Sequence, residues 1–206
     1  MVRGICVAAA CIIGLGAVAI AGDADLELCK SDANNSDVIA ACDRVIARGN
    51  LSKEDLYSAY YERGMKRRGN RQFDQAISDF TAAIAVSPKT WAYVARGHAY
   101  AYKKDFARAF ADQEKAIAME ATEVTYTGRA MDLIEAGAYD RAIADLNEAL
   151  RINNKYLYGY LARGDAYLKK REFDKAGADY QAALQIKPDN QEAKNGIKRA
   201  RAHQTN

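Results

Sequence analysis

Apolar and small residues recur at helical spacing along most of the chain, and the pattern itself repeats at a nearly fixed interval. A five-residue block starts with tyrosine, has arginine fourth and ends in a small residue; it fills 60–64, 93–97, 126–130 and 160–164. Its last residue therefore advances by 33, 33 and 34 positions. A period in this range is typical of stacked helical arrays and predicts antiparallel helix pairs rather than a catalytic domain.

The remainder of each period fits the second helix of such a pair. An aromatic residue, which would open that helix, lies nine positions after each block: Phe73, Phe106, Tyr139 and Phe173. Alanines follow twelve and nineteen positions after the block: Ala76, Ala109, Ala142 and Ala176, then Ala83, Ala116, Ala149 and Ala183. Small residues allow two helices to pack closely. Prolines close the first and last periods at Pro88 and Pro188, where they would end a helix.

Over about residues 57–190 this pattern resembles the tetratricopeptide repeat family, and with the N-terminus described below it is similar to an exported bacterial member. The resemblance implies an all-α fold, a right-handed superhelix of antiparallel helix hairpins (an α-solenoid). The expected units are 57–89, 90–122, 123–156 and 157–190. Two units depart from the pattern. Gln113 stands where the others have Phe80, Leu146 and Tyr180, and the third block carries Gly128 before its arginine and ends in Ala130.

A charge pattern runs in phase with the repeat. Each block arginine is followed by an aspartate sixteen residues later: Arg63 and Asp79, Arg96 and Asp112, Arg129 and Asp145, Arg163 and Asp179. In a helical hairpin this spacing could bring the two side chains together, so we predict one structural ion pair per repeat. The alternative is an arginine ladder that binds phosphate or carboxylate. Because every arginine has its own aspartate at the same spacing, the structural pairs are favoured. Such pairs mainly fix the geometry of the helix hairpin.

The charge balance bounds the class of partner. The chain has 206 residues and a formal net charge of +3, which is too balanced for a protein whose basic face grips nucleic acid. Basic residues do gather at the expected turns: Lys66, Arg67, Arg68, Arg71, Lys103, Lys104, Lys169, Lys170 and Arg171. Cations suit the C-terminal ends of helices, so this rim is either a solvated, dipole-matched edge or a surface for an acidic partner or anionic membrane.

The first 21 residues have the features of a secretory signal peptide. Arg3 precedes the apolar run 5–21, which ends in the small-x-small site at Ala19 and Ala21, and acidic residues follow at once. We expect cleavage there and a periplasmic or secreted protein. The alternative is an uncleaved anchor, since the run is just long enough to span a bilayer.

Removal of that segment leaves two cysteines, Cys29 and Cys42. A lone pair in an exported chain indicates a disulfide, and the spacing is not that of a Cys-x-x-Cys redox site. Cys42 aligns with Phe80, so the bond would staple a degenerate helical hairpin over 22–56. At the other end, 191–206 is expected to form a cap helix followed by a disordered tail.

The resemblance also implies a concave groove lined by the first helix of each repeat, with Tyr60, Tyr93, Tyr126 and Tyr160 in the core. The groove positions are then Tyr61, Met65, Trp91, Val94, His98, Tyr102, Val124, Met131, Ile134, Tyr158, Leu161 and Leu168. Such an apolar and aromatic strip is typical of an interface. Trp91, the single tryptophan, is the expected anchor. The alternative is that tight coiling or the N-terminal hairpin buries the strip.

The sequence contains no recognisable catalytic or metal-binding motif. His98 and His203 are the only histidines, no Cys/His cluster offers a metal site, and no phosphate loop or nucleophile elbow occurs. No acid or nucleophile is placed in the sequence to serve His98, so its expected role is contact. We therefore expect neither enzymatic activity nor a cofactor.

Three functions stay open. The first is a non-catalytic protein–protein adaptor of the periplasm or cell envelope that binds an apolar peptide segment in the groove. The second is an envelope-assembly or transport accessory tethered by an uncleaved N-terminus. The third is a binder of a small ligand or glycan. Some family members grip a terminal carboxylate with polar first-helix residues, but the matching positions here are Tyr61, Met65, Ala95, Val124 and Gly128, which cannot do so.

Overall fold

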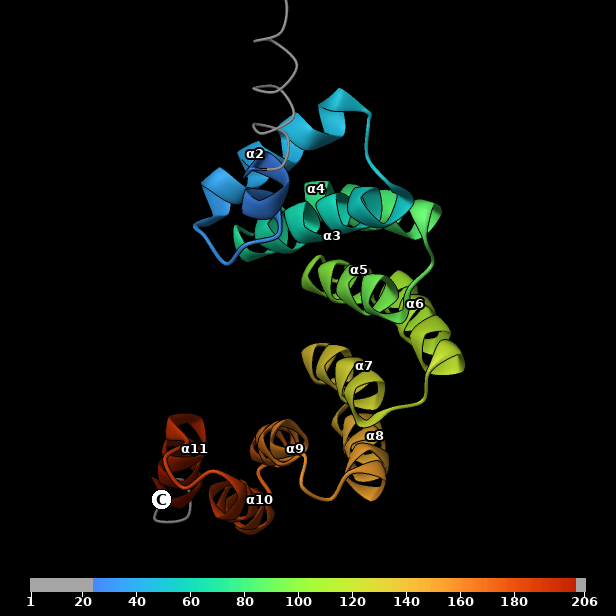
Figure 1. Ribbon diagram of the computed structural model, residues 1–206. Coiled ribbons are helices and arrows are strands. Elements are labelled where there is room, and N and C mark those ends of the chain that lie inside the picture. The colour runs from blue at the N-terminus through green and yellow to red at the C-terminus, as the bar shows by residue number, and fades with distance from the viewer. Residues whose placement is uncertain (1–23, 203–206) are drawn as a thin grey trace, which may run out of the picture.

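The computed structural model describes residues 24–202, and every regular element in that range is a helix (Figure 1). Helical residues 24–29 precede α2 (Asn35–Arg48), α3 (Lys53–Gly69), α4 (Phe73–Val86), α5 (Thr90–Tyr102), α6 (Phe106–Met119), α7 (Glu123–Glu135), α8 (Tyr139–Ile152), α9 (Leu157–Lys169), α10 (Phe173–Ile186) and α11 (Gln191–Ala202). The expected signal peptide at 1–21 and the tail beyond 202 lie outside the described residues.

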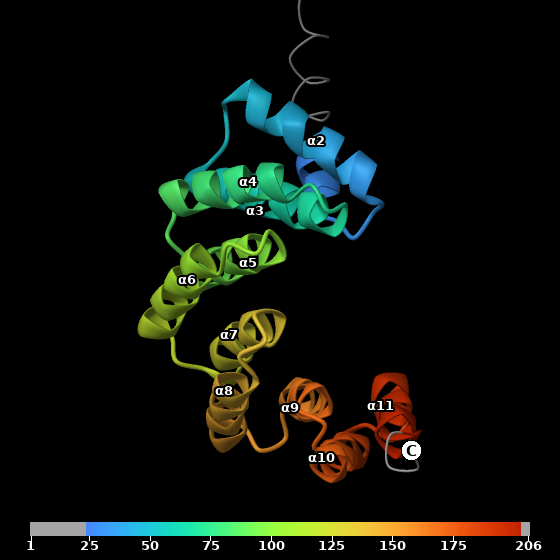
Figure 2. The same ribbon diagram turned by 180° about the vertical axis from the view of Figure 1, so that it is seen from behind.

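Successive antiparallel pairs stack into a curved array, with α5, α7 and α9 on its inner side and α6, α8 and α10 on its outer side (Figures 1 and 2). The all-α solenoid is thereby confirmed. The helix α3 starts at Lys53, ahead of the boundary placed at residue 57. Its start is set by Ser52, whose side chain accepts a hydrogen bond from the Asp55 amide at 3.1 Å and caps the helix.

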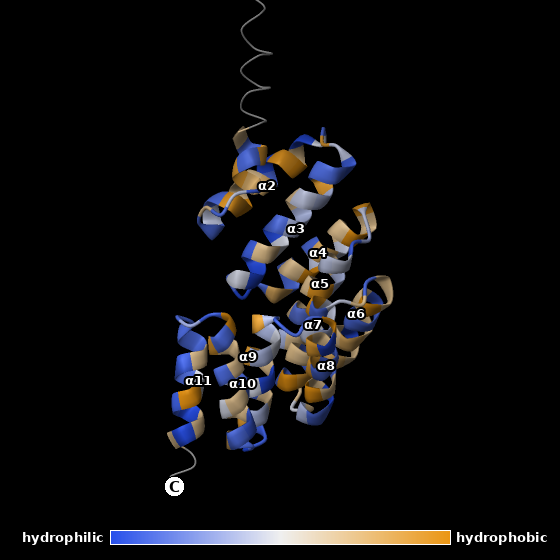
Figure 3. Ribbon diagram, turned by 60° about the horizontal axis from the view of Figure 1, so that its bottom comes forward, coloured by the Kyte–Doolittle hydropathy of each residue, from blue (hydrophilic) through white to orange (hydrophobic). Residues whose placement is uncertain are grey.

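Glycine and alanine set the distance between the helices of a hairpin. A Cβ added to Gly64 would lie 2.7 Å from the Phe80 ring, and one added to Gly164 would lie 2.8 Å from the Tyr180 ring. Such contacts are too short, so the α3–α4 and α9–α10 approaches require glycine at these positions. The repeat alanines Ala76, Ala83, Ala176 and Ala183 are fully buried beside these rings. Colouring by hydropathy shows apolar residues interspersed with polar ones along the helices (Figure 3), as amphipathic helices require.

The block tyrosines are half-buried rather than core residues, which corrects their expected placement. Each is covered by the arginine three positions later, in the same helix. The guanidinium carbon lies 5.5 Å from the Tyr60 ring centre, 5.8 Å from Tyr93, 5.9 Å from Tyr126 and 5.7 Å from Tyr160. The ring face attracts the cation, so each tyrosine holds its arginine in place.

The structure brings all four predicted arginine–aspartate pairs together. The shortest nitrogen–oxygen distances are 2.6 Å for Arg63–Asp79, 2.8 Å for Arg96–Asp112, 2.7 Å for Arg129–Asp145 and 2.7 Å for Arg163–Asp179. In the last three pairs Nε and Nη2 each donate to a different carboxylate oxygen. The four aspartates are buried. Their hydrogen bonds raise the pKa of Arg96, Arg129 and Arg163, which fits a structural role.

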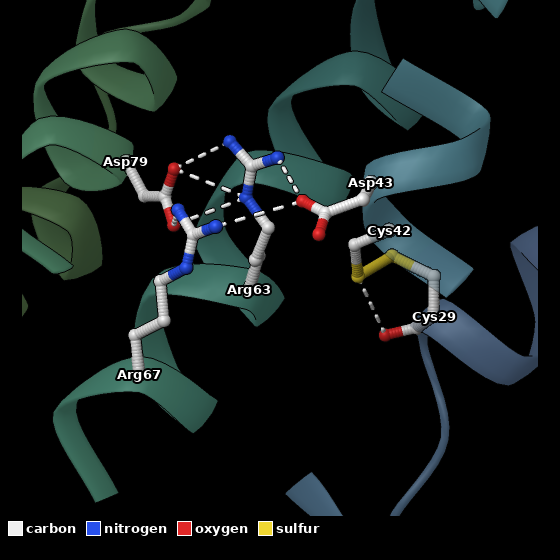
Figure 4. Close-up of polar contacts among 6 residues, drawn as sticks. All are labelled: Cys29, Cys42, Asp43, Arg63, Arg67 and Asp79. Carbon is white, nitrogen blue, oxygen red and sulfur yellow. Dashed lines mark hydrogen bonds and ion pairs between the residues drawn. A yellow bond between two sulfur atoms is a disulfide. The ribbon is translucent and has the colours of Figure 1, made fainter. Parts of the chain in front are cut away.

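Three of these arginines, Arg63, Arg96 and Arg163, also reach the preceding unit. Arg163 donates from Nη1 to Asn147 at 2.7 Å, and Arg96 donates to the Thr81 hydroxyl at 3.0 Å. Arg63 lies between Asp79 and Asp43, which it reaches at 2.6 Å (Figure 4). Each of these guanidinium groups therefore joins its own hairpin to the second helix of the hairpin before it.

A disulfide between Cys29 and Cys42 links helical residues 24–29 to α2, with Cα atoms 4.9 Å apart (Figure 4). Both cysteines are fully buried against Val38, Val45 and Ala59. At the opposite end α11 covers the last hairpin. Gly196 allows this contact, because a Cβ there would lie 2.5 Å from the Tyr180 ring. Within residues 24–202, no helix has both the length and the apolar character to cross a bilayer.

Arg96→Ala is expected to lower the free energy of unfolding by about 2 kcal/mol, because it leaves the Asp112 carboxylate buried without its main donor. Urea denaturation followed by circular dichroism measures the change. Arg108→Ala is the matched control, since its pair with Asp105 lies on the exposed surface and should matter far less. Equal losses in both variants would show that the repeat pairs are not structural.

Peptide mapping tests the staple. Trypsin cuts after Lys30, so unreduced protein should yield the Cys29 and Cys42 peptides as one linked species that separates on reduction. A Cys29→Ser/Cys42→Ser variant should lose about 3 kcal/mol of stability, since closure of a loop of this size restricts the unfolded chain. Alkylated free thiols at both positions in protein purified without reductant would contradict the bond.

Candidate binding groove on the concave face

The inner side of the stack holds an open concavity of about 1030 Å³, lined chiefly by α3, α5, α7 and α9. The predicted groove residues that line it are Tyr61, Met65, Trp91, Val94, His98, Tyr102, Val124, Met131, Ile134, Tyr158 and Leu161. Leu168 does not line it. Its side chain packs into the apolar cluster around Tyr180, because the end of α9 faces the hairpin's own core.

Four large side chains in the concavity are exposed to solvent. Trp91 is 49% exposed, Tyr102 55%, Met131 51% and Tyr158 62%. These values speak against burial of the strip by tight coiling or by the N-terminal hairpin. Val94 and Leu161 are buried, at 7% and 3% exposed, so they form part of the floor rather than the rim. Exposed aromatic and methionine side chains gathered over a buried apolar floor are typical of an interface.

Burial also affects tyrosines in the walls. Desolvation raises the pKa of Tyr61, and it raises the pKa of Tyr156 on the opposite wall. Both phenols therefore stay protonated at neutral pH and can donate hydrogen bonds. Tyr102 stacks on Phe73, with ring centres 5.2 Å apart, and this contact fixes one edge of the concavity at the turn between α3 and α4.

The floor contains a polar cluster that the sequence did not predict. His98 Nδ1 lies 2.6 Å from Asp132 Oδ1, and Gln113 Nε2 donates to Asp132 Oδ2 at 2.6 Å. The expectation that no acid serves His98 is therefore wrong. The acid comes from the next repeat, 34 residues further along the chain, so a search within one unit could not find it. The replacement of an apolar core residue by Gln113 was the visible sign of this cluster.

Gly128 lets α5 and α7 approach at this cluster. A Cβ there would lie 3.3 Å from both Gln113 Oε1 and Val94 Cγ1. Two buried oxygens beside it, Gln113 Oε1 and Thr127 Oγ1, have no hydrogen-bond partner. Within residues 24–202, no three His, Cys, Asp or Glu side chains are arranged to hold a metal ion. The cluster thus offers hydrogen-bonding capacity.

Two tetratricopeptide repeat models match the chain, over residues 92–123 and 127–191. No curated protein sequence matches it. The fold resembles a thermophilic TPR protein from Thermus thermophilus, at 17% identity and a TM-score of 0.72, over 88% of this chain and 99% of that one.

Larger proteins contain the same arrangement. Yeast Tom70 matches at 18% identity and a TM-score of 0.63, over 84% of this chain and 40% of its own. A chain of the APC/C hetero-tetramer Cut9-Hcn1 matches at 19% identity and a TM-score of 0.64, over 81% of this chain. This chain spans only 33% of the length of that similar chain. At such identities the likeness concerns the fold. With the matching repeat models and the periodic contacts above, it identifies the chain as a member of the tetratricopeptide repeat family.

Proposed function

We propose that the protein is a non-catalytic adaptor that binds an apolar segment of another protein in its concave groove. The family supports an interaction scaffold in general. The observation that carries the finer proposal is the exposed strip of Trp91, Tyr102, Met131 and Tyr158 over a continuous concavity. Apolar side chains of a partner would displace water from this strip, and burial of apolar area favours binding.

The groove suits an extended or helical segment better than a small ligand. Half of Trp91 is accessible, so no closed pocket surrounds it. The accessible aromatic and methionine side chains are spread over α5, α7 and α9, and a chain laid across them would touch several repeats at once. Trp91 is the proposed anchor, because tryptophan contributes strongly to binding where it becomes desolvated.

We also propose that the adaptor works outside the cytoplasm, in the periplasm or as a secreted protein. The support is the apolar N-terminal run with its small-x-small site, together with the buried disulfide, a bond that persists in oxidising compartments. An uncleaved N-terminus would make the protein membrane-tethered, as an envelope-assembly or transport accessory would be.

Selection from a random twelve-residue peptide display library tests the groove. Peptides enriched on the wild-type protein should bind Trp91→Ala about 30-fold more weakly by isothermal titration, as loss of a hot-spot side chain implies. Met119→Ala is the matched control. Met119 is 42% exposed on the outer helix α6 and does not line the concavity. Equal binding to both variants would move the interface to the basic rim or the outer face.

Mass measurement of the protein purified from cells tests the location. The mature chain is expected to begin at Gly22 and to occur in the soluble envelope or medium fraction, because a signal peptidase cuts after the small-x-small site. A chain that retains Met1 and fractionates with membranes would instead support the tethered accessory.

A further inference from the structure

The adaptor proposal leaves the polar floor of the groove unexplained. Asp132 is 3% exposed, in a floor otherwise built from Val94, Leu161 and small residues, and the fully buried Gln113 lies behind it without lining the concavity. Burial of a polar oxygen without a partner costs about 1–3 kcal/mol. The floor contains two such oxygens, Gln113 Oε1 and Thr127 Oγ1, so a purely apolar ligand would leave this cost in place.

The hydrogen bonds fix which atoms of the cluster are donors. Gln113 donates from its amide nitrogen to Asp132 Oδ2 at 2.6 Å. Gln113 Oε1 is then the free acceptor. His98 Nδ1 lies 2.6 Å from Asp132 Oδ1, which leaves the other ring nitrogen, Nε2, outside this contact. In the neutral ring Nε2 accepts hydrogen bonds.

These free acceptors converge beside Gly128. The position that a Cβ would take there lies 3.3 Å from Gln113 Oε1 and 3.8 Å from His98 Nε2. Thr127, the preceding residue of α7, lines the concavity, and its unpartnered hydroxyl is buried. A group with two or more N–H bonds that enters at this point can donate to several acceptors at once.

The charge of the walls favours a positive group. Four carboxylates line the concavity along its α7, α9 and α11 side: Asp132, Glu135, Asp165 and Glu192. Among the described lining residues, the cationic side chains are Arg68 and Arg71, at the α3 end. Two further cations that do not line the concavity form ion pairs with these walls: Lys104 with Glu135, and Arg199 with Asp165. Within residues 24–202, Asp132 has no lysine or arginine partner, and its burial limits screening by salt.

We propose that the groove selects an apolar segment carrying one lysine or arginine, whose N–H groups bind at the His98–Asp132–Thr127 polar floor. This inference rests on the proposed groove function. The flanking apolar residues of the segment contact Trp91 on one side and Met131 and Tyr158 on the other. Hydrogen bonds from a cation to a buried carboxylate are stronger than those between neutral groups. The floor would therefore provide specificity, while the exposed strip provides buried apolar area.

The sequences of the selected peptides test the inference. On the wild-type protein, peptides that depend on Trp91 should share apolar residues around one position that is always lysine or arginine. Exchange of that residue for norleucine should weaken binding about tenfold or more, as loss of one partner of a buried charge pair does. The norleucine peptide should bind wild type and Asp132→Asn equally.

Two variants make the result independent of folding effects. Asp132→Asn removes the charge, and Thr127→Val removes a hydroxyl that bonds to nothing in the fold, so stability should be kept in the latter. Both should weaken the basic peptide and leave the norleucine peptide unchanged. Glu114→Gln, which removes an exposed carboxylate from the outer helix α6, is the control and should change neither.

The outcomes separate the two proposals. Trp91-dependent peptides without a fixed basic residue would overturn the inference and keep the apolar groove. Trp91-dependent basic peptides whose affinity is unchanged in both Asp132→Asn and Thr127→Val would also overturn it, since the contact would then lie elsewhere. Failure to enrich any Trp91-dependent peptide would count against the groove itself and, with it, against the inference.

Discussion

The buried aspartate on the second helix of each hairpin is the constraint from which the stack follows. A carboxylate removed from water is costly unless it is paired and hydrogen-bonded. The block arginine satisfies it, and the block tyrosine holds that arginine through its ring face. In three of the four hairpins the remaining guanidinium nitrogen reaches the preceding hairpin, at Asp43, Thr81 or Asn147, so the contact that satisfies the aspartate there also joins neighbouring units. One motif therefore serves the hairpin and the stack together.

Close packing adds the second condition. Gly64 and Gly164 receive aromatic rings from their own second helices, and alanines fill the space beside those rings. In the second hairpin the side chain opposite Gly97 is Gln113, whose nitrogen would lie 2.9 Å from a Cβ at that glycine. The helix approach is thus kept while the ring is replaced by an amide. This substitution preserves the geometry and changes the chemistry of the groove floor.

The sequence was sufficient for features that repeat within one unit. The helix pairs and the four arginine–aspartate contacts have both partners inside a single period, so spacing alone places them. Features between units were not accessible in the same way. The His98–Asp132 contact depends on how α5 packs against α7, and the placement of Leu168 depends on the direction that the end of α9 faces. Helix α3 begins at Lys53 because Ser52 caps it locally. The spacing of the repeats carries no information about such a cap.

Departures from the repeat gather in one region of the molecule. Gln113, Gly128 and Ala130 break the pattern, and all belong to the second and third units around α5, α6 and α7. Gln113 and Gly128 adjoin Asp132 or its partner His98 at the floor of the concavity. An apolar residue at position 113 would pack as its counterparts Phe80 and Leu146 do, without an unpartnered oxygen. A buried unpartnered oxygen lowers stability by an amount comparable to a sizeable part of a marginal protein's total. The Gln113 nitrogen satisfies the buried Asp132 within the fold, but its oxygen gains no such partner, and a ligand that donates hydrogen bonds at the floor would recover that loss on binding.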